Sequence, residues 1–283
     1  MSDNAPPPRH TIVITGASAG IGAALALRLA ADGHRLALAA RTGDALRAVA
    51  SEAESRGAQQ AIAIETDVRR RADVERLRDR TLDAFGDFDV WINNAGRGIA
   101  RPVLELTDDD VDEMIAVNLK SALYGMQAAV PHFITRGAGH VINVSSYLGR
   151  VPLASIRSAY SAAKAALNSL TANLRMDLRR QHPDIHVSLV MPGVVLTDFA
   201  RNVRGTPVPP QIVAVADASP ASAARGAAPR ASSMRPQTAA EVADSIAQLI
   251  AHPAPELYTN PASAALAARY FADVGAFEKG IPS

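Results

Sequence analysis

The sequence contains no cysteine, which excludes disulfides, thiol nucleophiles and cysteine-based metal sites. It has no apolar run near the roughly 18 residues of a membrane span, and its opening, MSDNAPPPRH, lacks the apolar core of a signal peptide. A net charge of +1 gives no reason to expect nucleic acid or an anionic membrane as a partner. His182 and His186 are four residues apart, but Pro183 argues against a shared helix turn. We therefore expect a cytoplasmic protein that binds no metal, membrane or nucleic acid.

Short apolar runs alternate with helical stretches along most of the chain. The runs predict strands within 10–16, 34–41, 59–68, 87–96, 139–146, 184–193 and 255–260. The stretches predict a helix over 19–33 with Gly33 as its C-terminal stop, and helices within 43–57, 71–86, 237–252 and 262–275. Two more helices are predicted to begin at 107, where Thr107 can act as the cap, and at 158. This alternation predicts an α/β fold: a doubly wound, Rossmann-type parallel sheet of about seven strands with helices on both faces. Ligands of such a sheet bind at the carboxyl ends of its strands.

The chain divides into a short tail and one long domain. We expect a flexible N-terminal tail over 1–9 and a single domain over 10–283. Residues 199–236 break the alternation, since they are rich in Ala, Pro and Ser and carry five arginines against one aspartate. We expect a substrate lid there. A partly disordered insertion and an ordered insertion used for subunit contacts are the alternatives.

The first predicted strand runs directly into TGASAGIG, with glycines at 16, 20 and 22. Glycines here permit a tight turn, a close approach of the backbone to a pyrophosphate, and a helix packed near the strand. The N-terminus of that helix favours phosphate. At the end of the second strand stands Arg41, where an acidic residue would bind the ribose 2′-hydroxyl of NAD. The arginine suits a 2′-phosphate, so NADP(H) is preferred over NAD(H).

Lysine and tyrosine are scarce, with three and five in the chain, yet Tyr160 and Lys164 stand four residues apart in SAYSAAKAALNSL. Residues at this spacing lie on one helix face, so the phenol and the ammonium can converge. Two amphipathic side chains lying on a helix surface would be the simpler interpretation.

With the glycine loop and this pair in place, the chain resembles the short-chain dehydrogenase/reductase superfamily, in its compact single-domain branch. Further motifs follow in the family's order: TDV after the third strand, NNAG after the fourth, VNLK in the next helix, INVSS after the fifth strand and PGVVLTD after the sixth. The resemblance implies catalytic roles for Asn118, Ser146, Tyr160 and Lys164. It implies cofactor contacts from Gly16, Ser18, Gly20, Ile21, Gly22, Arg41, Asp67, Val68, Asn94, Ala95, Gly96, Tyr160, Lys164, Pro192, Gly193, Val195 and Thr197.

Two features depart from the family's familiar form. The segment between Ser146 and Tyr160 is about one residue longer, which keeps Ser145 as a second candidate for the serine. The glycine-rich C-terminal segment of many members is replaced by PELYTNP. Residues 97–101, 147–157 and 194–236 should line the substrate pocket.

The resemblance implies that residues 10–283 form a dinucleotide-binding catalytic domain. It implies an NADPH-dependent oxidoreductase that transfers hydride between nicotinamide and a carbonyl or secondary alcohol. Tyr160 would be the general acid/base, its pKa of about 10 lowered by Lys164 and an oxidised nicotinamide ring. Ser146 would hold the substrate oxygen, and Asn118 a water that links Lys164 to solvent. A 3-oxoacyl carrier-protein reductase and a non-catalytic NADP-sensing regulator are the alternatives. The expected partners are a small-molecule carbonyl or alcohol substrate and further copies of the chain, as a homodimer or homotetramer.

Overall fold

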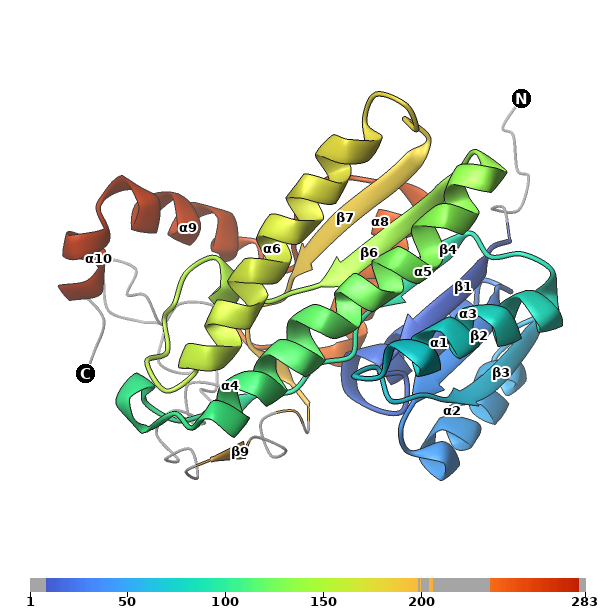
Figure 1. Cartoon of the computed structure of the whole chain (residues 1–283), viewed down its shortest axis with the longest axis horizontal. Coiled ribbons are helices and arrows are strands. Elements are labelled where there is room, and N and C mark those ends of the chain that lie inside the picture. The colour runs from blue at the N-terminus through green and yellow to red at the C-terminus, as the bar shows by residue number, and fades with distance from the viewer. Residues whose placement is uncertain (1–8, 198, 200–203, 206–234, 280–283) are drawn as a thin grey trace, which may run out of the picture.

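A seven-stranded parallel sheet forms the centre of the computed structural model, which describes residues 9–197, 199, 204–205 and 235–279. The strand order is β11-β7-β6-β4-β1-β2-β3 (Figure 1), and every neighbouring pair is parallel. The strands are β1 (Thr11–Thr15), β2 (Arg35–Ala40), β3 (Gln60–Glu65), β4 (Val90–Asn93), β6 (Gly139–Val144), β7 (Ile185–Met191) and β11 (Glu256–Tyr258). Each lies within a predicted run, so the predicted sheet is confirmed.

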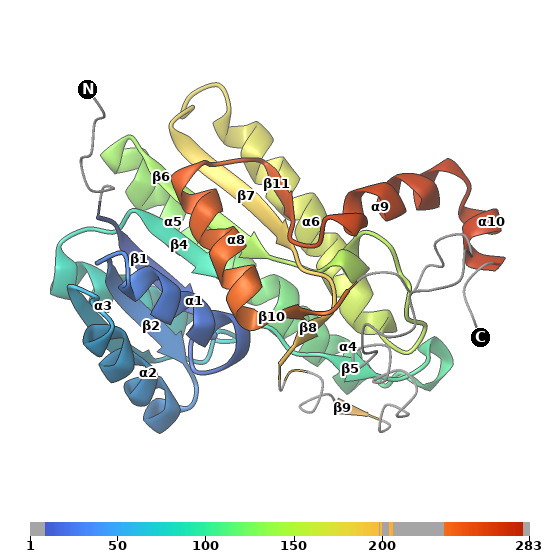
Figure 2. The same cartoon turned by 180° about the vertical axis from the view of Figure 1, so that it is seen from behind.

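Helices cover both faces of this sheet. On one face lie α3 (Arg71–Phe85), α5 (Ser121–Arg136) and α6 (Ser158–Leu178), in front of the sheet in Figure 1. On the other lie α1 (Gly20–Ala30), α2 (Gly43–Ser55) and α8 (Ala239–Ala251), in front in Figure 2. All five residues of β1 are buried, because a parallel sheet covered twice leaves neither side of a strand in water. The chain is one domain with an apolar cluster under each helical layer.

The sequence signals for helix ends hold in two of three places. Thr107 caps α4 (Asp108–Ile115) through a capping box with Asp110. Gly86, at φ +76°, ends α3 in the left-handed conformation. The predicted helix 19–33 is too long, since α1 ends at Ala30 and Gly33, at φ +76°, closes the turn that follows. The glycine therefore marks the end of the turn, not the end of the helix.

Several elements have no counterpart in the sequence prediction. A π-helical turn, η2 (Ala116–Lys120), joins α4 to α5. Two small parallel sheets pair β5 (Ile99–Ala100) with β9 (Arg204–Gly205), and β8 (Val195–Leu196) with β10 (Gln237–Thr238). Short 3₁₀ turns occupy η1 (Val103–Glu105) and η3 (Tyr147–Gly149). The last predicted helix is divided into α9 (Ala262–Ala272) and α10 (Val274–Lys279), which project from one end of the molecule (Figures 1 and 2).

Two expectations fall on residues that the structure does not describe. They are the N-terminal tail, apart from residue 9, and the lid, apart from 199, 204–205 and 235–236. Within the described ranges, no helix is both long enough and apolar enough to cross a membrane. The same ranges contain no group of three or more His, Cys, Asp or Glu side chains arranged to hold a metal ion.

Candidate active site

The glycine loop connects β1 to α1 at the carboxyl edge of the sheet. Gly16 and Gly20 adopt φ values of +68° and +57°, a region that side chains rarely adopt. At Gly22 a Cβ would press on the carbonyl oxygen of Gly16 and lie 2.6 Å from Nδ2 of Asn94. The loop therefore has room for backbone only. α1 begins with no side-chain cap and no acidic residue in its first turn, which leaves its positive end available to an anion.

The NNAG segment after β4 fastens this loop. The Nδ2 atom of Asn94 donates to the carbonyl oxygens of Thr15, at 3.0 Å, and Gly16, at 3.3 Å. Gly16 in turn is so close to Ala95 that a Cβ would lie 2.8 Å from its Cα. β1 and β4 are neighbours where the strand order reverses direction, the usual binding crevice of this fold. The residues present fit the pyrophosphate of a dinucleotide.

The residues expected to contact the adenosine end of the cofactor lie directly after the strands β2 and β3. Arg41 follows β2 and is exposed, while Asp67 and the buried Val68 follow β3. Arg69 donates to both carboxylate oxygens of Asp67, at 2.9 Å and 2.6 Å. These hydrogen bonds lower the pKa of Asp67, and the charge of Arg41 adds to the effect. Asp67 is thus held by Arg69, and in the described residues no carboxylate forms an ion pair with Arg41.

The expected contacts after β7 approach the glycine loop from the other side. Thr197 lies against Gly20, with its Cγ2 atom 3.6 Å from where a Cβ of the glycine would stand. Val195 belongs to β8, and the carbonyl oxygen of Pro192 accepts from the backbone N–H of Tyr147 at 2.8 Å. Of the remaining expected contacts, Ser18 and Ile21 lie in or beside the glycine loop, Gly96 in NNAG and Gly193 in the turn after β7.

Three of the four catalytic candidates come together at the carboxyl end of β6. Ser146 follows that strand, and Tyr160 and Lys164 lie one turn apart in α6. All three are buried, with 8%, 8% and 3% of their surface exposed. The Nζ atom of Lys164 donates to the carbonyl oxygen of Val144 at 2.9 Å and lies 5.9 Å from the centroid of the Tyr160 ring. The spacing of phenol and ammonium therefore produces a buried cluster and not a surface pair.

The electrostatics of this cluster differ from the expectation. Burial raises the pKa of Tyr160, while a hydrogen bond with Ser146 and the charge of Arg157 act to lower it. Burial also lowers the pKa of Lys164 to about 7, so its ammonium is partly neutralised near neutral pH. The pKa of Tyr160 is therefore raised and not lowered as expected, because the removal of the phenol from water is the largest influence on it.

The fourth candidate, Asn118, lies in the π-helical turn and is 1% exposed. Its Oδ1 accepts from the backbone N–H of Arg97 at 3.2 Å, and its Nδ2 donates to the carbonyl oxygens of Arg97, at 2.9 Å, and Met114, at 3.2 Å. Asn118 is close to Lys164 through Gly96, where a Cβ would be 3.1 Å from Oδ1 and 3.7 Å from Nζ. Through its hydrogen bonds with Arg97, the Asn118 side chain holds the segment that follows NNAG in place. π-helical turns are frequent at functional sites.

The two serines after β6 have different surroundings. The Ser145 hydroxyl donates to Oδ1 of Asn168 at 2.6 Å and so ties β6 to α6. The Ser146 hydroxyl accepts from the backbone N–H of Leu148 at 3.2 Å and forms the hydrogen bond with Tyr160. Ser146 is thus the serine beside the phenol, and Ser145 is engaged elsewhere.

Sequence reasoning missed two residues beside Tyr160. The ring of Phe199 lies 5.8 Å from the ring of Tyr160, and the guanidinium of Arg157 interacts with the phenol. The Arg157 Nη1 atom donates to the carbonyl oxygen of Ile99 at 3.1 Å. Each of the three segments expected to line the pocket thus supplies a residue here. Arg157 stands three residues before the tyrosine, but nothing in SIRSAY distinguishes it from a solvated arginine.

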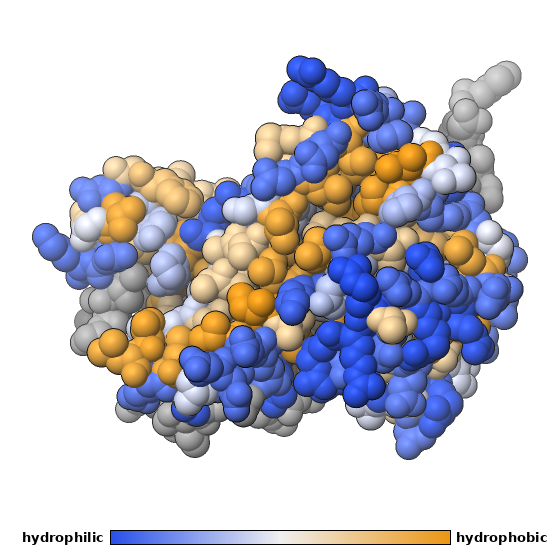
Figure 3. All heavy atoms as spheres, viewed as in Figure 1, coloured by the Kyte–Doolittle hydropathy of each residue, from blue (hydrophilic) through white to orange (hydrophobic). Residues whose placement is uncertain are grey.

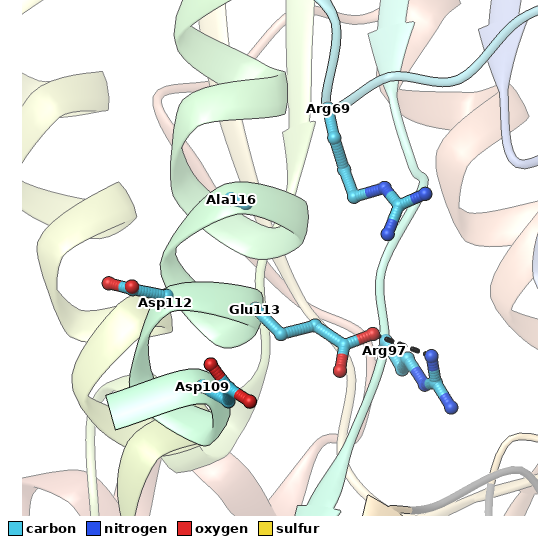
Figure 4. Close-up of a pocket in the computed structure, with 6 residues that line it drawn as sticks. All are labelled: Arg69, Arg97, Asp109, Asp112, Glu113 and Ala116. Carbon is cyan, nitrogen blue, oxygen red and sulfur yellow. Dashed lines mark hydrogen bonds and ion pairs between the residues drawn. The ribbon is translucent and has the colours of Figure 1, made fainter. Parts of the chain in front are cut away.

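A polar hollow of about 480 Å³ lies beside α4 and apart from this cluster (Figure 4). The Glu113 carboxylate points to Arg97 and pairs with it, while Arg69 pairs with Asp67. None of the four catalytic candidates lines the hollow, which is formed by Arg69, Arg97, Asp109, Asp112, Glu113 and Ala116. Its arginines already have partners within the chain.

The chain matches the family model of the short chain dehydrogenase over residues 10–207. An uncharacterized oxidoreductase of Bacillus subtilis, YxnA, is 36% identical over 191 residues, which cover 67% of this chain and 53% of the relative. The chain thus spans about half the length of that relative. An uncharacterized oxidoreductase of Staphylococcus aureus, SA2266, is 35% identical over 186 residues, covering 65% and 78%. The protein belongs to the short-chain dehydrogenase family.

Solved structures with this fold contain different dinucleotides. A short-chain dehydrogenase/reductase from Burkholderia phymatum, in complex with NAD, is similar with a TM-score of 0.80, 28% identity and 96% of both chains covered. An alcohol dehydrogenase from Thermococcus sibiricus, complexed with 5-hydroxy-NADP, has a TM-score of 0.72 and 28% identity, covering 89% of this chain and 97% of its own. A short-chain dehydrogenase from Sphingobium yanoikuyae, in complex with NADPH, has a TM-score of 0.72, 26% identity and coverages of 95% and 94%. These neighbours do not decide between NAD and NADP.

Proposed function

We propose that the protein is an NADPH-dependent oxidoreductase that interconverts a carbonyl compound and a secondary alcohol. The observation that carries the proposal is the buried cluster of Ser146, Tyr160 and Lys164 at the sheet edge that also holds the glycine loop. A nicotinamide dinucleotide bound there would supply or accept the hydride. The protein then has to position one carbonyl and manage one proton.

Tyr160 is the group that moves this proton. Its raised pKa keeps the phenol protonated at neutral pH, which suits the reduction direction, in which the phenol donates to the developing alkoxide. The Ser146 hydroxyl, beside the phenol, donates to the same oxygen and stabilises the charge that develops on it. Lys164 lies one helical turn further and holds the site's second exchangeable proton. Asn118 positions the segment after NNAG, next to Lys164.

The preference for NADPH rests on Arg41. Because Arg69 occupies the carboxylate of Asp67, the exposed guanidinium of Arg41 is available for the 2′-phosphate. The positive dipole end of α2 lies directly after it, but Asp44 in the first turn of that helix offsets the dipole. The preference for an additional phosphate over a free hydroxyl therefore depends on the guanidinium of Arg41.

We propose that the active protein is a homodimer, or a homotetramer made of two such dimers, built on the outer face of α5 and α6. A groove of about 390 Å³ runs between these helices, and apolar residues are prominent along it in Figure 3. A second copy would remove this apolar surface from water. The groove is lined by Leu123, Met126, Gln127, Val130, Pro131, Leu170, Asn173, Leu174 and Asp177.

Reduction of a panel of ketones and aldehydes by NADPH, followed by absorbance, tests the proposal. Tyr160→Phe should lower kcat at least ~100-fold with NADPH affinity nearly unchanged, because it removes the acid and keeps the ring. A variant that retains most of its kcat would refute the role of Tyr160. NADPH binding without turnover of any carbonyl would indicate a sensing regulator, and turnover only of carrier-bound 3-oxoacyl groups a carrier-protein reductase.

A further inference from the structure

Arg157 occupies an unusual place for a cation. It is the N-cap residue of α6, the 21-residue helix that carries Tyr160 and Lys164. The N-terminus of a helix is the positive end of its dipole, so a positive charge there is disfavoured and an anion is favoured. The first turn of α6 contains no acidic residue, and no side chain caps the helix. The charge of Arg157 is therefore not compensated by its own helix.

The guanidinium is held against the segment that follows NNAG. Its Nη1 atom donates to the carbonyl oxygen of Ile99 at 3.1 Å and would lie 3.1 Å from a Cβ at residue 98. The Phe199 ring approaches the same point to 3.0 Å and lies 5.8 Å from the ring of Tyr160. Gly98 thus leaves the space in which Arg157 and Phe199 meet. Arg157 is partly buried there and interacts with the phenol of Tyr160.

Neighbouring arginines pair with carboxylates, whereas Arg157 has no such pair in the part of the chain that the structure describes. Arg97 pairs with Glu113, Arg101 with Asp110 and Arg150 with Glu256. Over residues 9–197, 199, 204–205 and 235–279, no carboxylate forms an ion pair with Arg157, and its one hydrogen bond with a side-chain atom is the bond to Ile99. A guanidinium has five N–H donors, so further N–H groups of Arg157 are available to bind an oxyanion. Partly buried charges of this kind are normally paired.

We propose that Arg157 binds a carboxylate of the substrate, so that the substrate is an oxo acid or the corresponding hydroxy acid. This inference rests on the proposed function and names its substrate class. Arg157 and Tyr160 are three residues apart on one helix, which favours a short separation between the carboxylate and the reacting carbonyl. The exposed ring of Phe199 provides apolar surface for the carbons between them. The planar guanidinium fork matches a carboxylate, and its single charge balances the single charge of that group.

The test compares oxo acids with their primary amides, which keep the shape and remove the charge. The series places one to four carbons between the carbonyl and the carboxyl carbon. Wild-type protein should prefer at least one acid over its amide by roughly 10- to 100-fold in kcat/KM, the range expected for a charge-assisted hydrogen-bonded pair. In Arg157→Gln, kcat/KM should fall at least roughly tenfold more for that acid than for its amide, chiefly through KM. Arg157→Lys should restore part of the preference.

Arg150→Gln is the matched control, since Arg150 lies on the same segment but pairs with Glu256. It should change acid and amide kinetics by the same factor. The inference would be overturned if the wild-type enzyme had a higher kcat/KM for the amides than for the oxo acids. A higher kcat/KM for a carbonyl compound that carries a phosphate than for every oxo acid would also overturn it. Equal losses for acid and amide in Arg157→Gln would also overturn it, since Arg157 would then act only on Tyr160 or on folding.

A binding measurement separates this inference from the proposed function. Short carboxylates and their amides are titrated into the NADP⁺-bound wild-type protein and Arg157→Gln by calorimetry. Carboxylate binding that weakens in the variant, without turnover of any carbonyl, would support the Arg157 site and refute the oxidoreductase. Turnover of neutral ketones, with no difference between carboxylate and amide binding, would support the oxidoreductase and refute the Arg157 site.

Discussion

Replacing Lys164 with methionine should stabilise the cofactor-free protein near neutral pH. The ammonium is buried, and burial lowers its pKa from 10.5 to about 7. The gap corresponds to about 5 kcal/mol, at about 1.4 kcal/mol for each pH unit. This free energy is the stability that the protein loses when Lys164 is protonated in the folded state. Methionine has a similar length and no charge, so it removes this cost.

The net gain is smaller because Lys164 also makes a hydrogen bond. Its Nζ atom donates to the carbonyl oxygen of Val144 at 2.9 Å. Leaving that buried carbonyl unpaired costs about 1–3 kcal/mol. We therefore expect Lys164→Met to be more stable than wild type by about 2–4 kcal/mol at pH 7 or below, while losing activity.

The sign of the pH dependence follows from proton binding. The unfolded lysine stays protonated up to pH 10.5, whereas the folded lysine loses its proton near pH 7. The destabilisation is complete below pH 7 and is relieved as the pH rises toward 10.5, because the unfolded state binds more protons in that window. Wild-type stability should therefore approach that of Lys164→Met by up to about 1.4 kcal/mol per pH unit above pH 7.

Urea unfolding of the cofactor-free protein at several pH values between about 7 and 9.5 measures this difference. The raised pKa values of Tyr147 and Tyr160 act only above this window, since unfolded tyrosine titrates near 10.0. Lys120→Met is the matched control, because Lys120 is exposed, and its difference from wild type should not vary with pH. Parallel curves for wild type and Lys164→Met, or a variant less stable at every pH, would refute the reasoning.

Three further predictions concern other parts of the site. Arg41→Ala should shift the preference for NADPH over NADH by roughly 10- to 150-fold in dissociation constants. Arg47→Ala, which removes an exposed arginine in the helix that follows Arg41, should not, and equal NADH and NADPH affinity in wild type would contradict this. Ser146→Ala should lower kcat by roughly 10- to 100-fold with an unchanged melting temperature. Ser145→Ala should lower the melting temperature, because it removes a buried hydrogen bond. If Ser145→Ala lowered kcat and Ser146→Ala lowered the melting temperature, the two roles would be exchanged. Leu174→Glu should convert the oligomer to a monomer in light scattering, and an unchanged mass would place the interface elsewhere.

The sheet and much of the site could be predicted because their signals are local. The inner strands are buried on both faces, so they appear as apolar runs of four to seven residues in the sequence, whereas the edge strands β3 and β11 are only partly buried. Parallel strands also bring their carboxyl ends to one edge, so residues after β1, β4 and β6 had to meet there. The end of α1 was misplaced because Gly33 lies in a turn beyond the helix, and a glycine in either place gives the same sequence pattern.

What could not be predicted depends on contacts between distant residues. Arg157 meets Ile99 across 58 positions, and both lie near Phe199 only because the chain returns to the same edge. No local pattern in SIRSAY distinguishes a solvated arginine from one held beside a phenol. The pKa values have the same origin, since the Tyr160–Lys164 spacing indicates attraction, whereas the directions of both pKa shifts come from the core that buries the two groups. Motif spacing therefore predicts which groups meet, and the packing around them decides which protonation states they adopt.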